Sequence, residues 1–212
     1  MKIPSIYKTD SGSIFVISAP SGTGKTTLCQ ALSKQYQTIK YTVSCTTRTQ
    51  RTGEINGLHY HFFSKEKFIE MVRQQKFAEW AEVYGNLYGT LKQDIIELNS
   101  QGFDVLMDID TQGALQIKKA FPHALLIFIL PPSLADLKQR LLNRHTESEE
   151  QIRGRIQQVK EEVKALQDFD YLLVNDTFDE ALKVLEALFI SNRNKITNIN
   201  PKWIEYFLEG FY

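Results

Sequence analysis

This sequence has few of the residues that build disulfide frameworks, metal clusters or membrane spans. Its two cysteines, Cys29 and Cys45, form neither a Cys-x-x-Cys pair nor a His/Cys cluster, so we expect two free thiols. No apolar stretch approaches the roughly 20 residues that cross a bilayer, and the N-terminus lacks the basic and then apolar layout of a secretory signal. These absences predict a soluble, cytoplasmic protein without a membrane partner.

The chain also has no excess of charge of either sign. Its 25 Lys and Arg residues balance 25 Asp and Glu residues, so the net charge does not indicate a nucleic-acid partner. It contains no internal repeat and no low-complexity segment. With 212 residues, of which 42% are apolar, it can bury a sizeable core, and we expect one compact α/β body.

Four apolar runs of strand length alternate with segments of helical periodicity. The runs cover residues 14–17, 105–109, 125–130 and 171–174. This alternation predicts a parallel sheet, whose ligands bind beyond the carboxyl ends of the strands. We therefore expect the polar residues at those ends to converge on one site.

A phosphate-binding pattern follows the first run. Residues 19–26 read APSGTGKT, which matches the P-loop pattern G-x-x-x-x-G-K-[ST] except that Ala19 replaces the first glycine. Gly22 and Gly24 let the backbone wrap around an anion, the next helix directs its N–H groups and dipole at it, and Lys25 adds a positive charge. Thr26 offers a hydroxyl to Mg²⁺. The strand before and the helix after favour nucleotide binding over an ordinary Gly/Ser-rich turn.

A second anion site is indicated in residues 44–54, where Arg48 and Arg51 lie among hydroxyl side chains. Two guanidinium groups can hold a phosphate through paired, charge-assisted hydrogen bonds. Taken alone, such a pair is also consistent with solvated or salt-bridged surface arginines.

Three other regions differ in character. Residues 40–90 contain short strand-like pieces broken by glycines and predict a small β-rich insertion. Residues 134–165 are highly charged and form either a solvated helical pair or a mobile lid. The tail after residue 191 is dense in aromatics, and we expect it to pack either on the protein's own core or on a second subunit, as in a homo-oligomer. The aromatic residues of the tail are Trp203, Tyr206, Phe207, Phe211 and Tyr212.

Several ordered motifs together resemble the guanylate kinase family over residues 12–190. They are residues 48–60, EWAEVYGNLYGT at 79–90, VLMDID at 105–110 with the following Gln-Gly, ILPPS at 129–133, RLLNR at 140–144 and VND at 174–176. The resemblance implies a kinase that transfers the γ-phosphate of ATP to GMP, and also to dGMP, with Mg²⁺ as cofactor. It further implies an α/β fold: a parallel P-loop sheet flanked by helices, with a small β-rich GMP-binding insertion and a helical lid.

The resemblance also implies the site residues. The phosphate of GMP is expected at Arg48, Arg51, Tyr60 and Tyr88, and the guanine at Ser44, Glu79, Thr90 and Asp108; Glu54 and Asp110 complete this GMP-binding set. ATP is expected at Ala19, Pro20, Ser21, Gly22, Thr23, Gly24, Lys25, Thr26, Thr27, Arg140, Arg144 and Asn175. Catalysis is expected from Lys25, Arg48, Arg140, Arg144 and Arg155.

Elementary chemistry supports parts of this assignment. Guanine presents two adjacent donors, N1–H and the N2 amine, which suit an acceptor-only carboxylate such as Glu79. Asp108 ends an apolar strand, where P-loop enzymes place an acidic group toward magnesium, and Asp110 should point the same way from that strand. Thr26 and Asp108 are the predicted metal ligands, although the spacing leaves open which aspartate serves the metal. Arg140 and Arg144 are four residues apart and can share one helical face.

The predicted organisation has a nucleotide-binding core at residues 1–40, 91–133 and 166–190. A GMP-binding insertion occupies 41–90, a lid 134–165 and an aromatic tail 191–212. The chain departs from the family pattern at Gln50, Leu87 and His145, none of which is a predicted substrate contact.

Three other functions fit the sequence less well. A guanylate-kinase-like interaction module would lack the intact P-loop, a kinase for another nucleoside monophosphate is disfavoured by Glu79 and Thr90, and a GTP-hydrolysing switch would carry an Asn-Lys-x-Asp signature.

Overall fold

The computed structural model describes residues 6–7, 11–83, 85–143 and 149–209. Its centre is a five-stranded, fully parallel sheet in the order β2-β7-β1-β8-β9. The strands are β1 (Ile14–Ser18), β2 (Ile39–Tyr41), β7 (Asp104–Asp108), β8 (Leu125–Leu130) and β9 (Tyr171–Val174). The predicted parallel α/β sheet is confirmed. The strand β2 was not among the predicted runs, because three residues are too few to show a periodic pattern.

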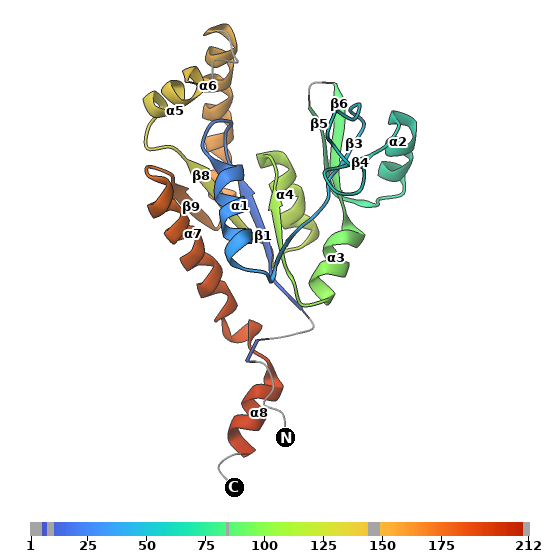
Figure 1. Ribbon diagram of the computed structural model, residues 1–212, viewed down its shortest axis with the longest axis vertical. Coiled ribbons are helices and arrows are strands. Elements are labelled where there is room, and N and C mark those ends of the chain that lie inside the picture. Colours follow the sequence, from blue (N-terminus) through green and yellow to red (C-terminus); the bar gives the residue numbers. More distant parts are fainter. Residues whose placement is uncertain (1–5, 8–10, 84, 144–148, 210–212) are drawn as a thin grey trace.

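Helices cover both faces of this sheet because side chains alternate along each strand. Phe15 and Ile17 of β1 pack with α1 (Lys25–Gln35) and α7 (Phe178–Arg193) in one buried cluster. Val16, between them, belongs to a second cluster with α3 (Lys92–Ser100) and α4 (Thr111–Ala120). Figure 1 shows α1 and α7 on one side of β1 and α4 on the other. This packing fixes the positions of the carboxyl ends of the strands relative to one another.

The insertion forms a separate four-stranded sheet in the order β4-β3-β6-β5. Its strands are β3 (Cys45–Thr46), β4 (His61–Phe62), β5 (Phe77–Val83) and β6 (Asn86–Leu91). It also contains a helix that the prediction of a β-rich segment did not include, α2 (Lys65–Arg73), which Ser64 caps by accepting a hydrogen bond from the Lys67 N–H at 3.2 Å. Buried Phe68 of α2 stacks on Phe77 of β5 and anchors the helix to the sheet.

Gly89 does not break this insertion as the sequence had suggested. It lies inside β6, and a Cβ atom there would come within 2.8 Å of the Glu79 carbonyl oxygen on β5. Glycine at this position therefore permits close approach of two strands, whereas Gly53, Gly57 and Gly85 have positive φ angles and form turns.

The charged region consists of α5 (Leu134–Leu142) and α6 (Glu149–Val163), followed by a short 3-10 helix η1 (Lys164–Asp168). The two long helices share a small core of their own, to which Leu137, Leu141, Ile152 and Val159 contribute. Figure 1 shows them at the upper left and the small sheet with α2 at the upper right, on either side of the carboxyl end of the central sheet.

The aromatic tail does not pack on the core of its own chain within the described residues. After a short 3-10 helix, η2 (Ile196–Asn198), the helix α8 (Pro201–Glu209) projects away from the body and buries none of its residues. Its base is held by Ile6, whose carbonyl accepts a hydrogen bond from the Asn200 N–H at 2.9 Å. Phe211 and Tyr212 lie outside the described residues, and packing on a second subunit stays a prediction.

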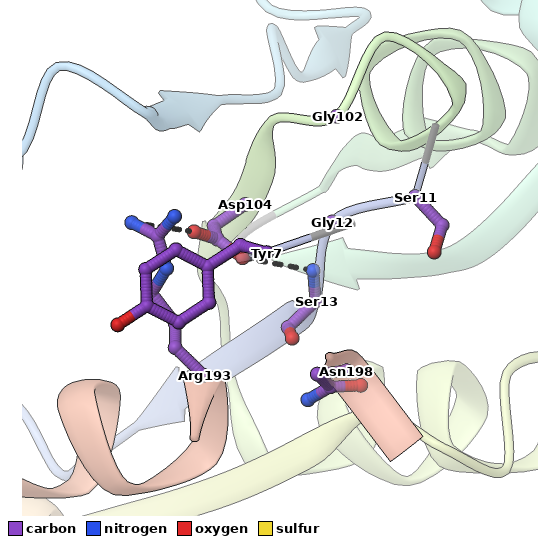
Figure 2. A pocket seen from close by; sticks show the side chains of 8 residues that line it. All are labelled: Tyr7, Ser11, Gly12, Ser13, Gly102, Asp104, Arg193 and Asn198. Atoms are coloured by element: carbon purple, nitrogen blue, oxygen red, sulfur yellow. Dashed lines mark hydrogen bonds and ion pairs between the residues drawn. The ribbon is translucent and has the colours of Figure 1, made fainter. Parts of the chain in front are cut away.

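The amino ends of the strands carry a small polar cleft (Figure 2). There the buried carboxylate of Asp104 accepts a hydrogen bond from the Ser13 N–H at 2.9 Å and lies 3.9 Å from the Arg193 guanidinium, which stacks on Tyr7. The cleft measures about 20 Å³, which is room for one water and not for a nucleotide. These contacts tie the end of α7 to the sheet.

Neither cysteine forms a disulfide, as expected: Cys29 and Cys45 are free and buried. No helix within the described ranges has the length and apolar character that a membrane crossing requires.

Candidate active site

The loop between β1 and α1 has the geometry of an anion cradle. Gly22 and Gly24 adopt φ angles of +93° and +88°, which favour glycine. Gly24 occupies the N-cap of α1, where no side chain caps the helix and its first turn contains no acidic residue. The N–H groups of that turn, which includes Thr26 and Thr27, therefore remain available to an anion.

Two contacts hold this loop in shape. The Thr23 hydroxyl donates to the Pro20 carbonyl at 3.0 Å, and Asn175, at the end of β9, donates from Nδ2 to the Thr23 carbonyl at 2.6 Å. Ala19 can replace the usual glycine because its φ angle is not positive. The convergence of β1 and β9 on one loop thus places Asn175 at the P-loop.

Asp108, at the end of β7, connects the two polar residues that open α1. Its Oδ1 lies 2.7 Å from Lys25 Nζ, and its Oδ2 accepts a hydrogen bond from the Thr26 hydroxyl at 2.7 Å. Lys25 also donates to the Ile109 carbonyl at 2.8 Å. Parallel strands β1 and β7, with Ile17 opposite Asp108, produce this arrangement.

A second pocket, of about 190 Å³, lies between the small sheet and the end of β7. Most of the residues predicted to bind GMP line it: Ser44, Tyr60, Glu79, Tyr88, Asp108 and Asp110. Two chain segments distant in sequence, the insertion and the β7–α4 connection, meet here because β5 packs against α4.

Glu79 is the buried charge of this pocket, with a side chain on β5 that is 6% exposed. Its Oε1 accepts a hydrogen bond from the Thr90 hydroxyl at 2.6 Å, and Oε2 lies close to Gly113 in the first turn of α4. Burial raises the pKa of Glu79 to about 7, with a smaller contribution from Asp110, while the Thr90 bonds lower it. The carboxylate is thus poised to change charge near neutral pH.

Arg48 is held in place next to Tyr60, which lines this pocket. Its guanidinium forms a bidentate pair with Glu54, at 3.0 Å and 2.7 Å, and packs over the Tyr60 and Phe62 rings. The Arg48 hydrogen bond is the main reason why the pKa of Glu54 falls to about 2, so this carboxylate stays ionised. The Arg51 N–H also donates to Glu54 at 2.7 Å, while the Arg51 side chain is exposed.

The charged helices bring two arginines to the loops of the core. Arg140 of α5 donates to the carbonyls of Asn175 and Asp176, at 2.9 Å and 3.2 Å. Arg155 of α6 donates to the Ser21 hydroxyl in the P-loop. The helix α5 ends at Leu142, and Arg144 lies outside the described residues, so a helical face shared by Arg140 and Arg144 stays a prediction.

The comparisons with known proteins decide the family. The sequence profile of guanylate kinase matches residues 11–192. The guanylate kinase of Clostridioides difficile (strain 630) is 45% identical over 198 residues, which are 93% of this chain and 97% of that protein. The guanylate kinase of Syntrophomonas wolfei is 46% identical over 191 residues, or 90% of this chain and 98% of that protein. This chain belongs to the guanylate kinase family.

A solved member of the guanylate kinase family has the same fold. The crystal structure of guanylate kinase from Anaplasma phagocytophilum superposes with a TM-score of 0.70 at 29% sequence identity, and the match covers 90% of this chain and 91% of that one. The resemblance stated from the motifs is therefore confirmed, and so is the α/β fold class.

One expectation about the two aspartates is wrong. β7 ends at Asp108, so Asp110 does not extend from the same strand; it is the N-cap of α4, and its Oδ1 accepts a hydrogen bond from the Gly113 N–H at 2.7 Å. Its carboxylate still lines the second pocket. Only Asp108 of the two contacts Thr26.

The residues described fit a magnesium ion that is bound jointly with a nucleotide. No group of three or more His, Cys, Asp or Glu side chains among them could hold a metal alone. The available donors are the Thr26 hydroxyl and the Asp108 carboxylate, 2.7 Å apart. Magnesium sites in kinases characteristically combine one or two such oxygen ligands with substrate phosphates and water.

Two residues at the site were not found from the sequence. Gly113 was noted only as part of a motif, yet a Cβ atom there would lie 2.9 Å from Glu79 Oε2. The second is Glu162 on α6, which faces the P-loop. It belongs to a run of charged residues in which no sequence signal distinguishes it from Glu161.

Proposed function

We propose that this chain is an ATP:GMP phosphotransferase, a guanylate kinase that transfers the γ-phosphoryl group of ATP to GMP and yields ADP and GDP. The observation that carries this proposal is similarity to curated guanylate kinases at about 45% identity over almost the whole of both chains. The intact P-loop, with its Lys25–Asp108 pair, favours catalysis over a binding module.

The ATP phosphates bind the P-loop backbone and the N-terminus of α1, and Lys25 adds a mobile positive charge. Thr26 and Asp108 would hold a magnesium ion, and that ion would supply positive charge to neutralise the transferring phosphate. Asn175 fixes the loop through Thr23, and Arg140 fixes Asn175 and Asp176 in turn.

GMP occupies the second pocket with its base against Glu79. The ionised carboxylate accepts from the guanine N1–H and N2 amine, while Thr90 fixes the orientation of the carboxylate. Adenine presents an acceptor in place of the N1–H donor, which leaves buried polar groups unpaired and disfavours AMP. Ser44 and Asp108 complete the walls of the base site.

The GMP phosphate lies toward Arg48, Arg51, Tyr60 and Tyr88. Glu54 serves this site by orienting Arg48 through their bidentate pair. A direct contact of its carboxylate with the phosphate would be repulsive, because both groups are negatively charged. Direct contact between Glu54 and GMP stays a prediction.

Phosphoryl transfer needs no covalent intermediate and no dedicated base, because the GMP phosphate is already a nucleophile. The protein brings the two anions into line and compensates their charge through Lys25, Arg48, Arg140, Arg144 and Arg155. Closure of α5 and α6 as a lid excludes water, which would otherwise hydrolyse ATP.

The test is ADP formation from Mg-ATP, coupled to NADH oxidation, with GMP, dGMP, AMP, CMP and UMP compared as acceptors. Turnover limited to GMP and dGMP is expected. Activity with another monophosphate would contradict the role of Glu79, and absence of activity with all five would favour a binding module. A cytoplasmic location and the oligomeric state stay predictions.

A further inference from the structure

A carboxylate on α6 faces the P-loop and has no role in the transfer described above. Glu162 Oε1 accepts a hydrogen bond from Gln158 Nε2 at 2.9 Å. Its Oε2 is buried and has no hydrogen-bond partner among the described residues. An ionised oxygen in that position is costly unless another state of the protein supplies a partner or a compensating charge.

The surroundings of Glu162 relate it to the phosphate site. It lines a cavity of about 310 Å³ together with Pro20 and Ser21 of the P-loop and with Arg155, Gln158 and Val159 of α6. Burial is the main reason why the pKa of Glu162 is raised, while the Gln158 hydrogen bond and Lys25 lower it. Because this cavity adjoins the P-loop, Glu162 places a carboxyl group beside the position where the phosphates of ATP would bind.

A negative charge is unexpected in a site for anionic substrates. Two cations lie near it and offset it in part: Lys25, which is already 2.7 Å from the Asp108 carboxylate, and Arg155, which lines the same cavity and donates to the Ser21 hydroxyl. Repulsion between a carboxylate and phosphates strengthens in a partly desolvated cavity. A divalent cation bound to the phosphates cancels two of their negative charges and so weakens this repulsion.

We propose that Glu162 makes the phosphate site selective for ATP that carries its divalent metal, by repelling metal-free nucleotide. This inference rests on the proposed function, since it assumes that ATP binds the P-loop. Glu162 is thus a specificity-determining residue, separate from the Thr26 and Asp108 pair.

The chain supplies a matched control one residue away. Glu161 also lies on α6, but its side chain is 58% exposed and pairs with Lys164. Glu161→Gln and Glu162→Gln remove the same charge, and only the second removes it from the cavity. Gln at position 162 can still accept the Gln158 hydrogen bond through its amide oxygen.

The experiment is isothermal titration calorimetry of ATP into the full chain at about pH 8, once with excess Mg²⁺ and once with EDTA. The quantity compared is the dissociation constant of metal-free ATP divided by that of ATP with Mg²⁺. In Glu162→Gln we expect metal-free ATP to bind about tenfold more tightly and the ratio to fall about tenfold, as for one removed charge near the ligand. Glu161→Gln should keep the wild-type ratio.

A second pair of variants guards against a folding defect. Glu162→Asp retains the charge on a shorter side chain and Glu162→Asn removes it, so the ratio should be higher in the Asp variant. The inference is overturned if the wild-type chain phosphorylates GMP but the ratio does not change on removal of the charge. That result would be an equal ratio in Glu162→Gln and wild type, and in Glu162→Asn and Glu162→Asp. A wild-type chain that transfers phosphate to no nucleotide would instead overturn the proposed function.

Discussion

We predict that Glu79 makes the binding of guanine depend on pH. Burial raises its pKa to about 7, so the free protein increasingly holds a neutral carboxyl group below that pH. A neutral carboxyl presents a donor where guanine also presents donors, and binding of GMP therefore requires loss of the proton. The affinity for GMP should therefore fall as the pH drops below about 7 and level off above that pH.

We predict that the KM for GMP rises by up to about tenfold per pH unit on the acid side, while the KM for ATP changes little. Steady-state kinetics between about pH 6 and pH 8 measure both values. Glu79→Gln should show a high KM for GMP that no longer follows this profile. Parallel pH profiles for the two substrates would contradict the assignment.

Gly113 determines where the Glu79 carboxylate can lie. It sits in the first turn of α4, and a Cβ atom there would lie 2.9 Å from Glu79 Oε2 and 3.3 Å from the Ile109 side chain. Gly113→Ala should displace the carboxylate and raise the KM for GMP about tenfold or more, since a small misplacement weakens both hydrogen bonds. The unfolding temperature, followed by circular dichroism, should not fall comparably, because alanine favours the helix. An unchanged KM for GMP would show that the pocket absorbs the methyl group.

Lys25 is expected to act on the transferring phosphate and not on GMP. Lys25→Ala removes a charge from the phosphate site, and we predict a loss of at least about a hundredfold in kcat. The dissociation constant of GMP, measured by calorimetry without ATP, should stay within about threefold, although Asp108, which pairs with Lys25, lines the second pocket. A comparable weakening of GMP binding would contradict this division of roles.

At the scale of elements, α6 contains a glycine for which the structure shows no need. Gly154 is exposed in the interior of Glu149–Val163, and a Cβ atom there would meet nothing within 4 Å. Gly154→Ala should stabilise the protein by about 0.5–1 kcal/mol and raise the unfolding temperature by about 1–4 °C, as measured by differential scanning calorimetry.

Gly24→Ala is the contrasting variant. At φ +88° an added Cβ would lie 2.7 Å from Asn175 Nδ2, so this substitution should destabilise the loop and abolish most activity. Equal effects of the two substitutions would contradict the distinction between a permissive helix and a constrained loop.

At the scale of the whole molecule, we predict that the part of the tail before Asn200 stabilises the body and that the part after it does not. The helix α8 buries no residue, so a chain that ends at Asn200 should keep its kcat and its unfolding temperature. A chain that ends at Ser191 should unfold several degrees lower, because it also loses the Asn192 hydrogen bond to Ser13 and the Arg193 hydrogen bond to Thr38. Sedimentation velocity of both variants and the full chain tests the second-subunit alternative: a smaller assembly on removal of α8 alone would support it.

The sequence by itself determined the parallel sheet and the identity of the phosphate loop. Long apolar runs specify buried strands, and the P-loop pattern is local, since one strand, one glycine-rich turn and one helix suffice to form it. The motifs also identified the family and named Glu79, although a lone glutamate has no local signal for burial.

Only the tertiary structure decided which partners these residues have. The fold brings together segments far apart in the chain: it creates the 2.7 Å contacts of Asp108, the burial of Glu79 and the closeness of Gly113 to Glu79. It also places Glu162 against the P-loop, with one carboxylate oxygen that has no hydrogen-bond partner among the described residues. Periodicity could not show that Asp110 leaves its strand to cap a helix, or that α8 projects from the body. Sequence patterns report local backbone preference and burial, whereas the charge state and contacts of a side chain depend on which distant groups the fold brings within a few ångströms.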